Sequence, residues 1–316
     1  MRPIEWLERG LRSVVPSGVK SAVRSFVPGR RRTGANGRSG TFGALVDRRR
    51  EWLFEHLPAE SAAYHYDIFT KTSQKRLARR LGVPVADDHL VEVPLDEALA
   101  FVEASRLERF VIKPNLSYGA KGFRALERVD GAFRDLRTGA IASIGRIERQ
   151  LRREFDLRAR PDEWVVEELL ESFDGSAELP DDYKVYCFGG TAELIVHKRP
   201  IPGTRRYHAE TVSRDWEPID VGLEPVDADA AVAPVNGGRL VQVAEAAASQ
   251  LCYPFIRIDL YDSTKGVVLG EFTPGPGRRD AFDAEWDERL TRRWHEAAAA
   301  IDRGIRSGEM SPLSPE

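Results

Sequence analysis

"RIDLYDSTKGVVLGEFTPGPG" (residues 257–277) is the stretch that decides the fold. Two apolar, strand-like runs flank Ser-Thr-Lys, and this arrangement predicts a β-hairpin. Asp259 lies on the first run and Glu271 on the second, so we expect the two carboxylates to converge on one side of a sheet. The Thr-Pro-Gly-Pro-Gly end cannot continue a helix or a strand, so Glu271 is expected at the edge of a turn.

Converging carboxylates indicate a bound cation. Two acidic side chains placed close together repel each other, and a cation between them removes the repulsion. Oxygen ligands suit Mg²⁺, which retains waters and shares the phosphate groups of substrates. Arg257 shares the face of Asp259 and is suited to hold a transferring phosphoryl group. The alternative is a hairpin whose acids face solvent, but apolar neighbours such as Ile258 and Leu260 favour the metal interpretation.

A second stretch, "VIKPNLSYGAKGF" (residues 111–123), combines a lysine with a small, glycine-bearing loop. Lys113 ends an apolar strand, and Ser117, Gly119 and Gly122 follow it. A lysine at a strand end beside mobile backbone N–H groups is suited to cradle a phosphate. Lysines at strand ends and glycine loops also occur without this role, so the stretch is weak evidence by itself.

The remaining pattern predicts an α+β fold. Strands are expected to pair locally in hairpins, and helices intervene irregularly, unlike the βαβ alternation of a doubly wound sheet. We expect helices over 72–81, 94–105, 145–155, 238–251 and 287–304, and strands in 109–114, 163–170 and the hairpin 182–198.

Composition excludes several classes of protein. The net charge of −3 argues against nucleic acid as a partner, and no apolar run approaches the ~18 residues of a membrane span. Phosphate-loop, zinc-protease and serine-hydrolase motifs are absent from the sequence. Cys187 and Cys252 lie far apart in apolar surroundings, which predicts buried, reduced thiols and a cytoplasmic protein.

The first residues of the chain are basic. Residues 1–50 contain twelve Arg or Lys and three Asp or Glu, a local charge of +9. Residues 1–28 have near-helical apolar spacing, and 29–43 are rich in Gly and Arg. One interpretation is a helical pair packed on the body; the other is peripheral contact of residues 1–40 with the inner, anionic face of a membrane.

Together these motifs resemble the ATP-grasp superfamily, and specifically its TupA-like branch of teichuronopeptide biosynthesis. The resemblance covers roughly residues 64–297, and the order of the motifs is its specific part. The matching segments are "TKTSQKRLARRLGVPV" (70–85), "FVIKPNLSYGAKG" (110–122), "VVEELL" (165–170), "DDYKVYCFGG" (181–190), "RDWEPIDV" (214–221), "RIDLYD…GEFTPGPG" (257–277) and "AEWDERLTRRW" (284–294).

The resemblance implies a nucleotide held between two α+β subdomains, with ATP and Mg²⁺ as cofactors. We expect a small subdomain with a glycine-rich lid loop (106–170) and a large subdomain with the metal hairpin (171–316). A helical segment (44–105) precedes them, after a basic extension and linker (1–43) that the resemblance leaves unexplained. Two residues depart from the superfamily's usual pattern: Thr70 replaces an aspartate, and Thr273 replaces an asparagine that ligates metal.

The resemblance also implies roles for individual residues. Those assigned to ATP are Lys71, Lys113, Ser117, Gly119, Gly122, the adenine hinge Glu167, Glu168, Leu169 and Leu170, and the ribose contact Asp182. Asp259, Glu271 and Thr273 would hold Mg²⁺. Arg257, Lys184 and Arg199 would act on the acyl phosphate and the substrate. Arg199 belongs to the basic segment "HKRPIPGTRR" (197–206), which alternatively is a solvated loop.

The expected enzyme is a ligase that forms a C–N bond. ATP would convert a carboxylate into an acyl phosphate, and an amine would then attack it. The expected partners are carboxylate- and amine-bearing small molecules or glycan precursors, in cell-surface polysaccharide biosynthesis. Two alternatives remain: a phosphotransferase on the same fold, and a non-catalytic nucleotide-binding component of a glycan assembly.

Overall fold

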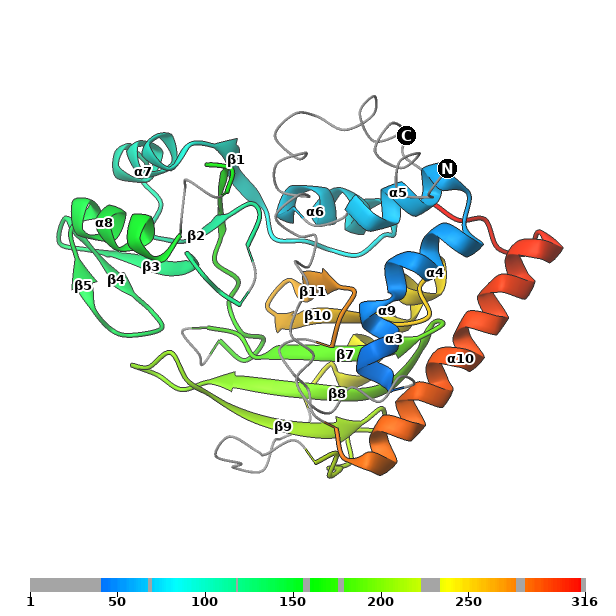
Figure 1. Ribbon diagram of the computed structural model, residues 1–316. Helices are drawn as coiled ribbons and strands as arrows, with labels where there is room; N and C mark the ends of the chain where they lie inside the picture. The colour runs from blue at the N-terminus through cyan, green and yellow to red at the C-terminus, as the bar shows by residue number, and fades with distance from the viewer. Residues whose placement is uncertain are drawn as a thin grey trace.

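The computed structural model describes residues 41–67, 70–117, 119–155, 160–175, 179–222, 234–276 and 282–313. The predicted basic extension falls outside the described residues, apart from 41–43. The described chain forms two antiparallel sheets with helices, so the predicted α+β class is confirmed (Figure 1).

The smaller subdomain is built on a six-stranded sheet in the order β1-β6-β2-β3-β4-β5. Its apolar core, with Phe110, Ile112 and Trp164, is completed by helices α7 and α8. The bounds of these elements are β1 Asp88–Val93, α7 Leu95–Ala104, β2 Arg109–Pro114, β3 Arg124–Val129, β4 Ala132–Asp135, β5 Ile141–Ala142, α8 Ile144–Glu154 and β6 Trp164–Glu168.

The larger subdomain is built on a five-stranded sheet in the order β11-β10-β7-β8-β9. Both predicted hairpins, β7–β8 and β10–β11, are confirmed by their antiparallel registers. Cys187 and Cys252 are free and buried, as predicted. The bounds are β7 Asp182–Phe188, β8 Thr191–Pro200, β9 Tyr207–Ser213, α9 Gly237–Gln250, β10 Ile256–Ser263, β11 Gly266–Thr273 and α10 Ala284–Ser307.

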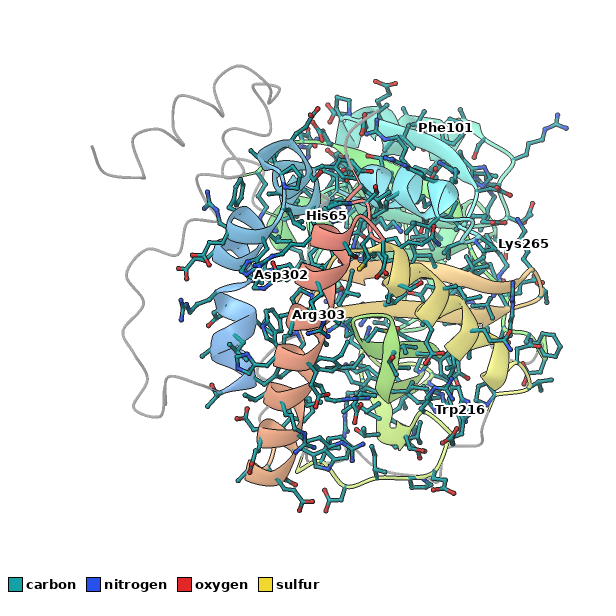
Figure 2. All side chains as sticks on the ribbon, turned by 90° about the vertical axis from the view of Figure 1, so that its right-hand side faces the viewer. His65, Phe101, Trp216, Lys265, Asp302 and Arg303 are labelled. Carbon is teal, nitrogen blue, oxygen red and sulfur yellow. The ribbon has the colours of Figure 1, made fainter. Side chains whose placement is uncertain are left out.

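The two faces of the large sheet are covered differently. Val185 and Ile195 point to the face that α9 covers, together with the helices before the small subdomain, α4 (Arg49–His56), α5 (Ala59–Asp67) and α6 (Lys71–Arg80). On the opposite face, Tyr186 and Leu194 pack under α10 and α3 (Phe42–Asp47). This second cluster covers one end of that face, so the other end can serve the site (Figures 1 and 2).

Strand β11 is the edge of the large sheet, and the segment around α6 closes it. Gln74 Nε2 donates to the Phe272 carbonyl, and the Phe272 N–H donates to Gln74 Oε1, both at 3.1 Å. The Leu269 N–H donates to the Pro84 carbonyl at 2.8 Å. These bonds satisfy backbone groups that an open edge would leave unpaired, and they fix β11 against α6.

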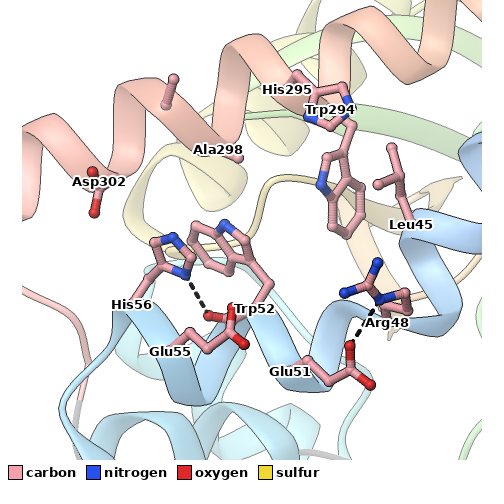
Figure 3. Close-up of a pocket in the computed structure, with 11 residues that line it drawn as sticks. Leu45, Arg48, Glu51, Trp52, Glu55, His56, Trp294, His295, Ala298 and Asp302 are labelled. Carbon is pink, nitrogen blue, oxygen red and sulfur yellow. Dashed lines mark hydrogen bonds and ion pairs between the residues drawn. The ribbon is translucent and has the colours of Figure 1, made fainter. Parts of the chain in front are cut away.

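A pocket of about 380 Å³ lies between α4 and α10 on the outside of the molecule (Figure 3). Its lining includes Trp294, and Trp52 stacked on His56 with 4.8 Å between the two ring centroids. None of the predicted site residues lines it. The predicted site residues therefore lie apart from this pocket.

Candidate active site

Asp259 and Glu271 face each other directly. They are Cα partners in the antiparallel β10–β11 pair, so both side chains leave the sheet on the same face, as the hairpin pattern predicted. Arg257 and Thr273 are partners one step along the same face. This convergence is the central geometric feature of the site.

A β-bulge sets the position of Glu271. The register shifts between Asp259 and Leu260, where Glu271 and Leu269 are the respective partners, so Gly270 is the extra residue. A Cβ on Gly270 would lie 2.8 Å from a ring carbon of Tyr261. Only a residue without a side chain lets the tyrosine ring lie against the bulge, and bulges of this kind redirect side chains beside active sites.

Lys184 on β7 neutralises the acids from the neighbouring strand. It is the Cα partner of Asp259 and lies 2.7 Å from that carboxylate and 2.6 Å from Asp182. Burial alone would lower the pKa of Lys184, but the two carboxylates outweigh it and raise the pKa. The lysine is therefore cationic.

Asp182 and Asp259 differ in their surroundings although they share Lys184. Burial raises the pKa of Asp182, and its Oδ1 atom is buried without a hydrogen-bond partner among the described residues. Burial also acts to raise the pKa of Asp259, but Arg257 and Lys184 reverse the effect and lower it well below its usual range. The two cations therefore keep Asp259 ionised.

Arg257 grips Asp259 with two nitrogens. Nε and Nη2 donate to the two carboxylate oxygens at 2.7 and 2.8 Å. Nη2 also lies 3.2 Å from Thr273 Oγ1, and Nη1 donates to the Pro276 carbonyl at 3.1 Å. This planar, bidentate contact fixes the guanidinium beside Asp259 and Glu271, the predicted metal ligands.

Two further lysines reach the cluster, one from α6, which packs on the large sheet, and one from β2 of the small subdomain. Lys71, the first residue of α6, lies 2.7 Å from Glu271. Lys113, near the end of β2, forms an ion pair with Glu167 of β6. Burial lowers the pKa of Lys113, Glu167 opposes this, and the nearby charges of Lys71 and Lys75 lower it further. The structure thus brings the predicted lysines and acids of both subdomains into one cluster.

Asn115 aligns the two lysines. Its carbonyl accepts the backbone N–H of Lys71 at 2.8 Å, and its Oδ1 accepts the backbone N–H of Thr72 at 3.1 Å. The side chain is buried, and Asn115 lies two residues after Lys113. The start of α6 is thereby tied to the end of β2. The sequence interpretation missed this residue, although a polar residue beside the strand-ending lysine was a visible signal.

The predicted hinge residues have unequal surroundings. Glu167 is buried, and its carboxylate contacts both Lys113 and Lys75, the latter at 2.6 Å. Glu168 lies 2.6 Å from Lys265 at the surface (Figure 2). Leu170 is buried in an apolar cluster that Tyr261 packs against, whereas Leu169 is only partly buried.

Comparison with protein families identifies the fold. The model of the family described as TupA-like ATP-grasp matches residues 97–294. The chain belongs to this family. The two α+β subdomains form its ATP-grasp fold. Lys113, Glu167 and the β10–β11 hairpin lie within the matched residues. Lys71 and Gln74 precede the match.

Solved structures of ATP-grasp ligases are also similar, at low identity. D-alanine–D-alanine ligase from Bacillus anthracis is 14% identical, with 78% of this chain and 71% of that chain covered and a TM-score of 0.45. The Coxiella burnetii D-alanine–D-alanine ligase is 17% identical, with 86% of this chain and 68% of that chain covered and a TM-score of 0.44. The ATP-grasp ligase PsnB, complexed with a minimal precursor, is 16% identical over 81% and 68%, with a TM-score of 0.42. No curated protein sequence matches the chain.

The glycine loop of this ATP-grasp protein follows β2. Gly119 and Gly122 have φ angles of +66° and +75°, and Ser117 precedes them, whereas Tyr118 lies outside the described residues. A Cβ on Gly122 would come within 2.7 Å of Pro114, so packing already requires glycine there. At Gly119 nothing lies within 4 Å of such a Cβ. Only the φ angle favours glycine at that position.

Arg199 does not join the cluster. His197 is the Cα partner of Tyr183, so 197 and 199 lie on the α9 side of the sheet, away from Lys184. Arg199 instead lies 3.5 Å from Asp181, which also contacts His197 at 2.7 Å. Its catalytic role stays a prediction that this geometry does not support. Lys198 of the same segment is the Cα partner of Asp182 and therefore lies on the site face.

Within the described ranges, no group of three or more His, Cys, Asp or Glu side chains is arranged to hold a metal ion. None of the helices that the structure describes combines the length and the apolar character needed to cross a membrane.

Proposed function

We propose that this ATP-grasp protein is an ATP- and Mg²⁺-dependent ligase that joins a carboxylate to an amine through an acyl phosphate. The observation that carries the proposal is the direct pairing of Asp259 with Glu271 on one sheet face. The cationic side chains of Lys71, Lys184 and Arg257 lie beside these acids. Membership of the ATP-grasp family supports ATP as the phosphoryl donor.

The donor set fits Mg²⁺. Asp259 and Glu271 offer hard carboxylate oxygens, and the Thr273 hydroxyl lies on the same face two residues after Glu271. Mg²⁺ favours few protein ligands completed by waters and phosphates, whereas structural zinc requires Cys or His ligands that this face lacks. When bound, the metal would supply charge neutralisation at the transferring phosphates.

The protein's own residues provide the remaining electrostatics. Lys71 on α6 and Lys113 on β2 are the residues that we expect to receive phosphate oxygens. Arg257 and Lys184, held on adjacent strands, are placed to stabilise the negative charge that develops when an amine attacks the acyl phosphate. A preformed set of cations needs little reorganisation during the reaction, and no nucleophilic side chain is required.

The apolar floor beside this cluster suits a nucleotide base. Leu170 and Tyr261 belong to one cluster with Ala86 and Val268, and these residues come from both subdomains. Stacking and burial against such a surface favour a planar heterocycle. We assign adenine to this end of the site and the phosphates to the lysine end.

Product analysis with purified full-length protein tests the function. ADP release is screened over amino acids and uronic acids, and the products are identified by mass spectrometry. A ligase yields ADP, phosphate and an amide. A stable phosphoester would instead identify a phosphotransferase, and the absence of nucleotide turnover under every condition would support a non-catalytic component.

The biological setting follows from the family branch alone. A role in cell-surface glycan or glycopeptide assembly, in the cytoplasm at the inner membrane face, is the setting in which we place the enzyme. The basic residues 1–40 would then contact anionic lipids. Deletion of residues 1–40 should release the protein from anionic vesicles without changing nucleotide affinity, and unaltered vesicle binding would refute the lipid contact.

A further inference from the structure

The charges of the cluster between the two subdomains balance one another. Its carboxylates and its cationic side chains are ion-paired with one another. The pairs are Lys71–Glu271, Lys75–Glu167, Lys75–Asp88, Lys113–Glu167, Lys184–Asp182, Lys184–Asp259 and Arg257–Asp259. A metal ion and a triphosphate therefore meet groups that are already satisfied, and binding must exchange one set of partners for another.

Lys71 and Glu271 are the pair in which this exchange has the clearest consequence. Lys71 Nζ lies 2.7 Å from Glu271 Oε1, with side chains 11% and 31% exposed. One partner is the predicted phosphate ligand, and the other is the predicted metal ligand. The lysine thus lies where a cation on Glu271 would compete with it.

Backbone contacts hold both members of the pair in place. At the start of α6, the backbone N–H of Lys71 donates to the carbonyl of Asn115. Next to Glu271, Phe272 is bound through both its N–H and its carbonyl by Gln74, which also lies on α6. The main chain at Lys71 belongs to α6, and the main chain next to Glu271 is bonded to α6. A ligand can therefore separate the two charges only by moving the side chains or by occupying the space between them.

We propose that Lys71 acts as the counterion of Glu271 in the ligand-free enzyme, and that exchange of this ion pair couples metal binding to nucleotide binding. The proposal rests on the proposed function for the identity of the ligands. Metal alone must displace the ammonium from Glu271, and nucleotide alone must draw the ammonium away and leave the carboxylate unpaired. When both bind, the metal pairs with Glu271 and a phosphate pairs with Lys71, so neither charge is left without a partner.

Binding measurements without turnover test this coupling. Mn²⁺ binding to the full chain is followed by electron paramagnetic resonance of the free ion, with and without a non-hydrolysable ATP analogue. The coupling factor is taken relative to the affinity of Mn²⁺ for the analogue in solution. For the wild-type protein we expect each ligand to tighten the other by roughly 5- to 150-fold, with the same factor in both directions. A coupling factor of one would overturn the proposal.

The variant Lys71→Met gives a result that a merely structural lysine would not give. It should bind Mn²⁺ alone about tenfold more tightly than the wild type does, because Glu271 has lost its internal cation. It should bind the analogue more weakly, and the coupling factor should fall towards one. Lys71→Arg, which retains the ion pair, should restore the wild-type Mn²⁺ affinity.

Lys113→Met is the matched control, because it removes the same charge from a neighbouring lysine whose partner is Glu167. Its effect on Mn²⁺ alone should be less than about threefold. An equal gain in the two variants would reduce the effect to general electrostatics and overturn the proposal, as would an unchanged or weaker Mn²⁺ affinity in Lys71→Met.

Glu271→Gln provides the reciprocal measurement if Lys71→Met unfolds. Without the carboxylate, Lys71 is released, so the analogue in the presence of a chelator should bind about tenfold more tightly than to the wild type. Unchanged or weaker binding would contradict the ion-pair exchange. These assays contain no acceptor substrate, so a failure to find an amide product would refute the ligase and leave the coupling result standing.

Discussion

The side chain of Gln74 binds the backbone of Phe272 as a neighbouring strand would. Its amide donates to the Phe272 carbonyl and accepts the Phe272 N–H, both at 3.1 Å, and Gln74 is 3% exposed. A helix residue thereby completes the edge of β11 immediately after Glu271. The position of Glu271 depends on this contact between α6 and β11.

Replacement of Gln74 by Leu should weaken both the fold and the site. Two buried backbone groups of Phe272 lose their partner, which costs about 1–3 kcal/mol in the free energy of unfolding. Nucleotide-dependent Mn²⁺ binding should weaken as well, because β11 is released. Denaturant unfolding measures the first effect. Gln250→Leu, an exposed glutamine on α9 that donates to the Ala246 carbonyl, is the control and should change stability by less than ~0.5 kcal/mol.

Gly270→Ala should be destabilising although alanine is a small residue. Its Cβ would lie 2.8 Å from the Tyr261 ring and 3.3 Å from the Asp259 carbonyl. The ring or the bulge must shift, which should lower the free energy of unfolding by about 1–3 kcal/mol. Glu271 should be displaced together with the bulge. Gly238→Ala on α9, where nothing lies within 4 Å of the new Cβ, should instead leave stability unchanged or raise it. Equal melting temperatures for the two variants would refute the bulge argument.

Glu271→Ala should abolish Mg²⁺-dependent ADP formation, with a loss of at least about 100-fold in kcat. The fold should persist, since Glu271 is partly exposed and its strand is held by backbone contacts. The measurement is coupled ADP detection together with circular dichroism. Glu285→Ala, at an exposed position of α10, serves as the comparison and should retain full turnover. Turnover by Glu271→Ala at the wild-type rate would remove Glu271 from the site.

Lys113→Ala should weaken nucleotide affinity by about tenfold or more, equivalent to about 1.4 kcal/mol. The reason is the loss of a buried cation at the phosphate end, where Glu167 keeps its contact with Lys75. Isothermal titration with a non-hydrolysable ATP analogue checks this. Lys265→Ala, which removes a half-exposed lysine paired with Asp87 and Glu168, is the control. A similar loss in both variants would count against a specific phosphate contact.

His65 should make the stability of the protein depend on pH. It is 1% exposed, its ring lies 5.1 Å from that of Tyr253, and neither ring nitrogen has a hydrogen-bond partner among the described residues (Figure 2). Burial, followed by the charge of Arg80, lowers the pKa of His65 to about 4 from 6.5. The unfolded chain therefore binds the proton first as the pH falls.

The stabilising contribution of neutral His65 is complete above pH 6.5 and is lost as the pH falls from 6.5 to about 4. The loss is on the order of 3 kcal/mol. His65→Leu should reduce the difference in unfolding free energy between pH 7 and pH 4.5 by about 2–3 kcal/mol. His295→Gln, at an exposed position of α10, should leave that difference unchanged. A pH dependence in His65→Leu equal to that of the wild type would exclude His65 as its source.

Much of the site could be predicted because its signals are local. Alternating apolar residues around a short turn predict a hairpin, and a hairpin brings Asp259 opposite Glu271 without further information. Lys184 could be placed on the same face only through the family resemblance, since its strand precedes β10 by about 70 residues in the chain. Arg199 shows the limit of this reasoning, because one step along a strand separates the site face from the α9 face.

The sequence by itself determined the α+β class, both hairpins of the large sheet and the residue types of a phosphate and metal site. These depend on side-chain periodicity and turn chemistry, which act between near neighbours. Only the tertiary structure decided that Lys71 pairs with Glu271, that Gln74 closes β11, and that Glu167 is shared by two lysines. Such contacts join residues far apart in the chain, and burial and charge neutralisation across two subdomains select them rather than any local pattern.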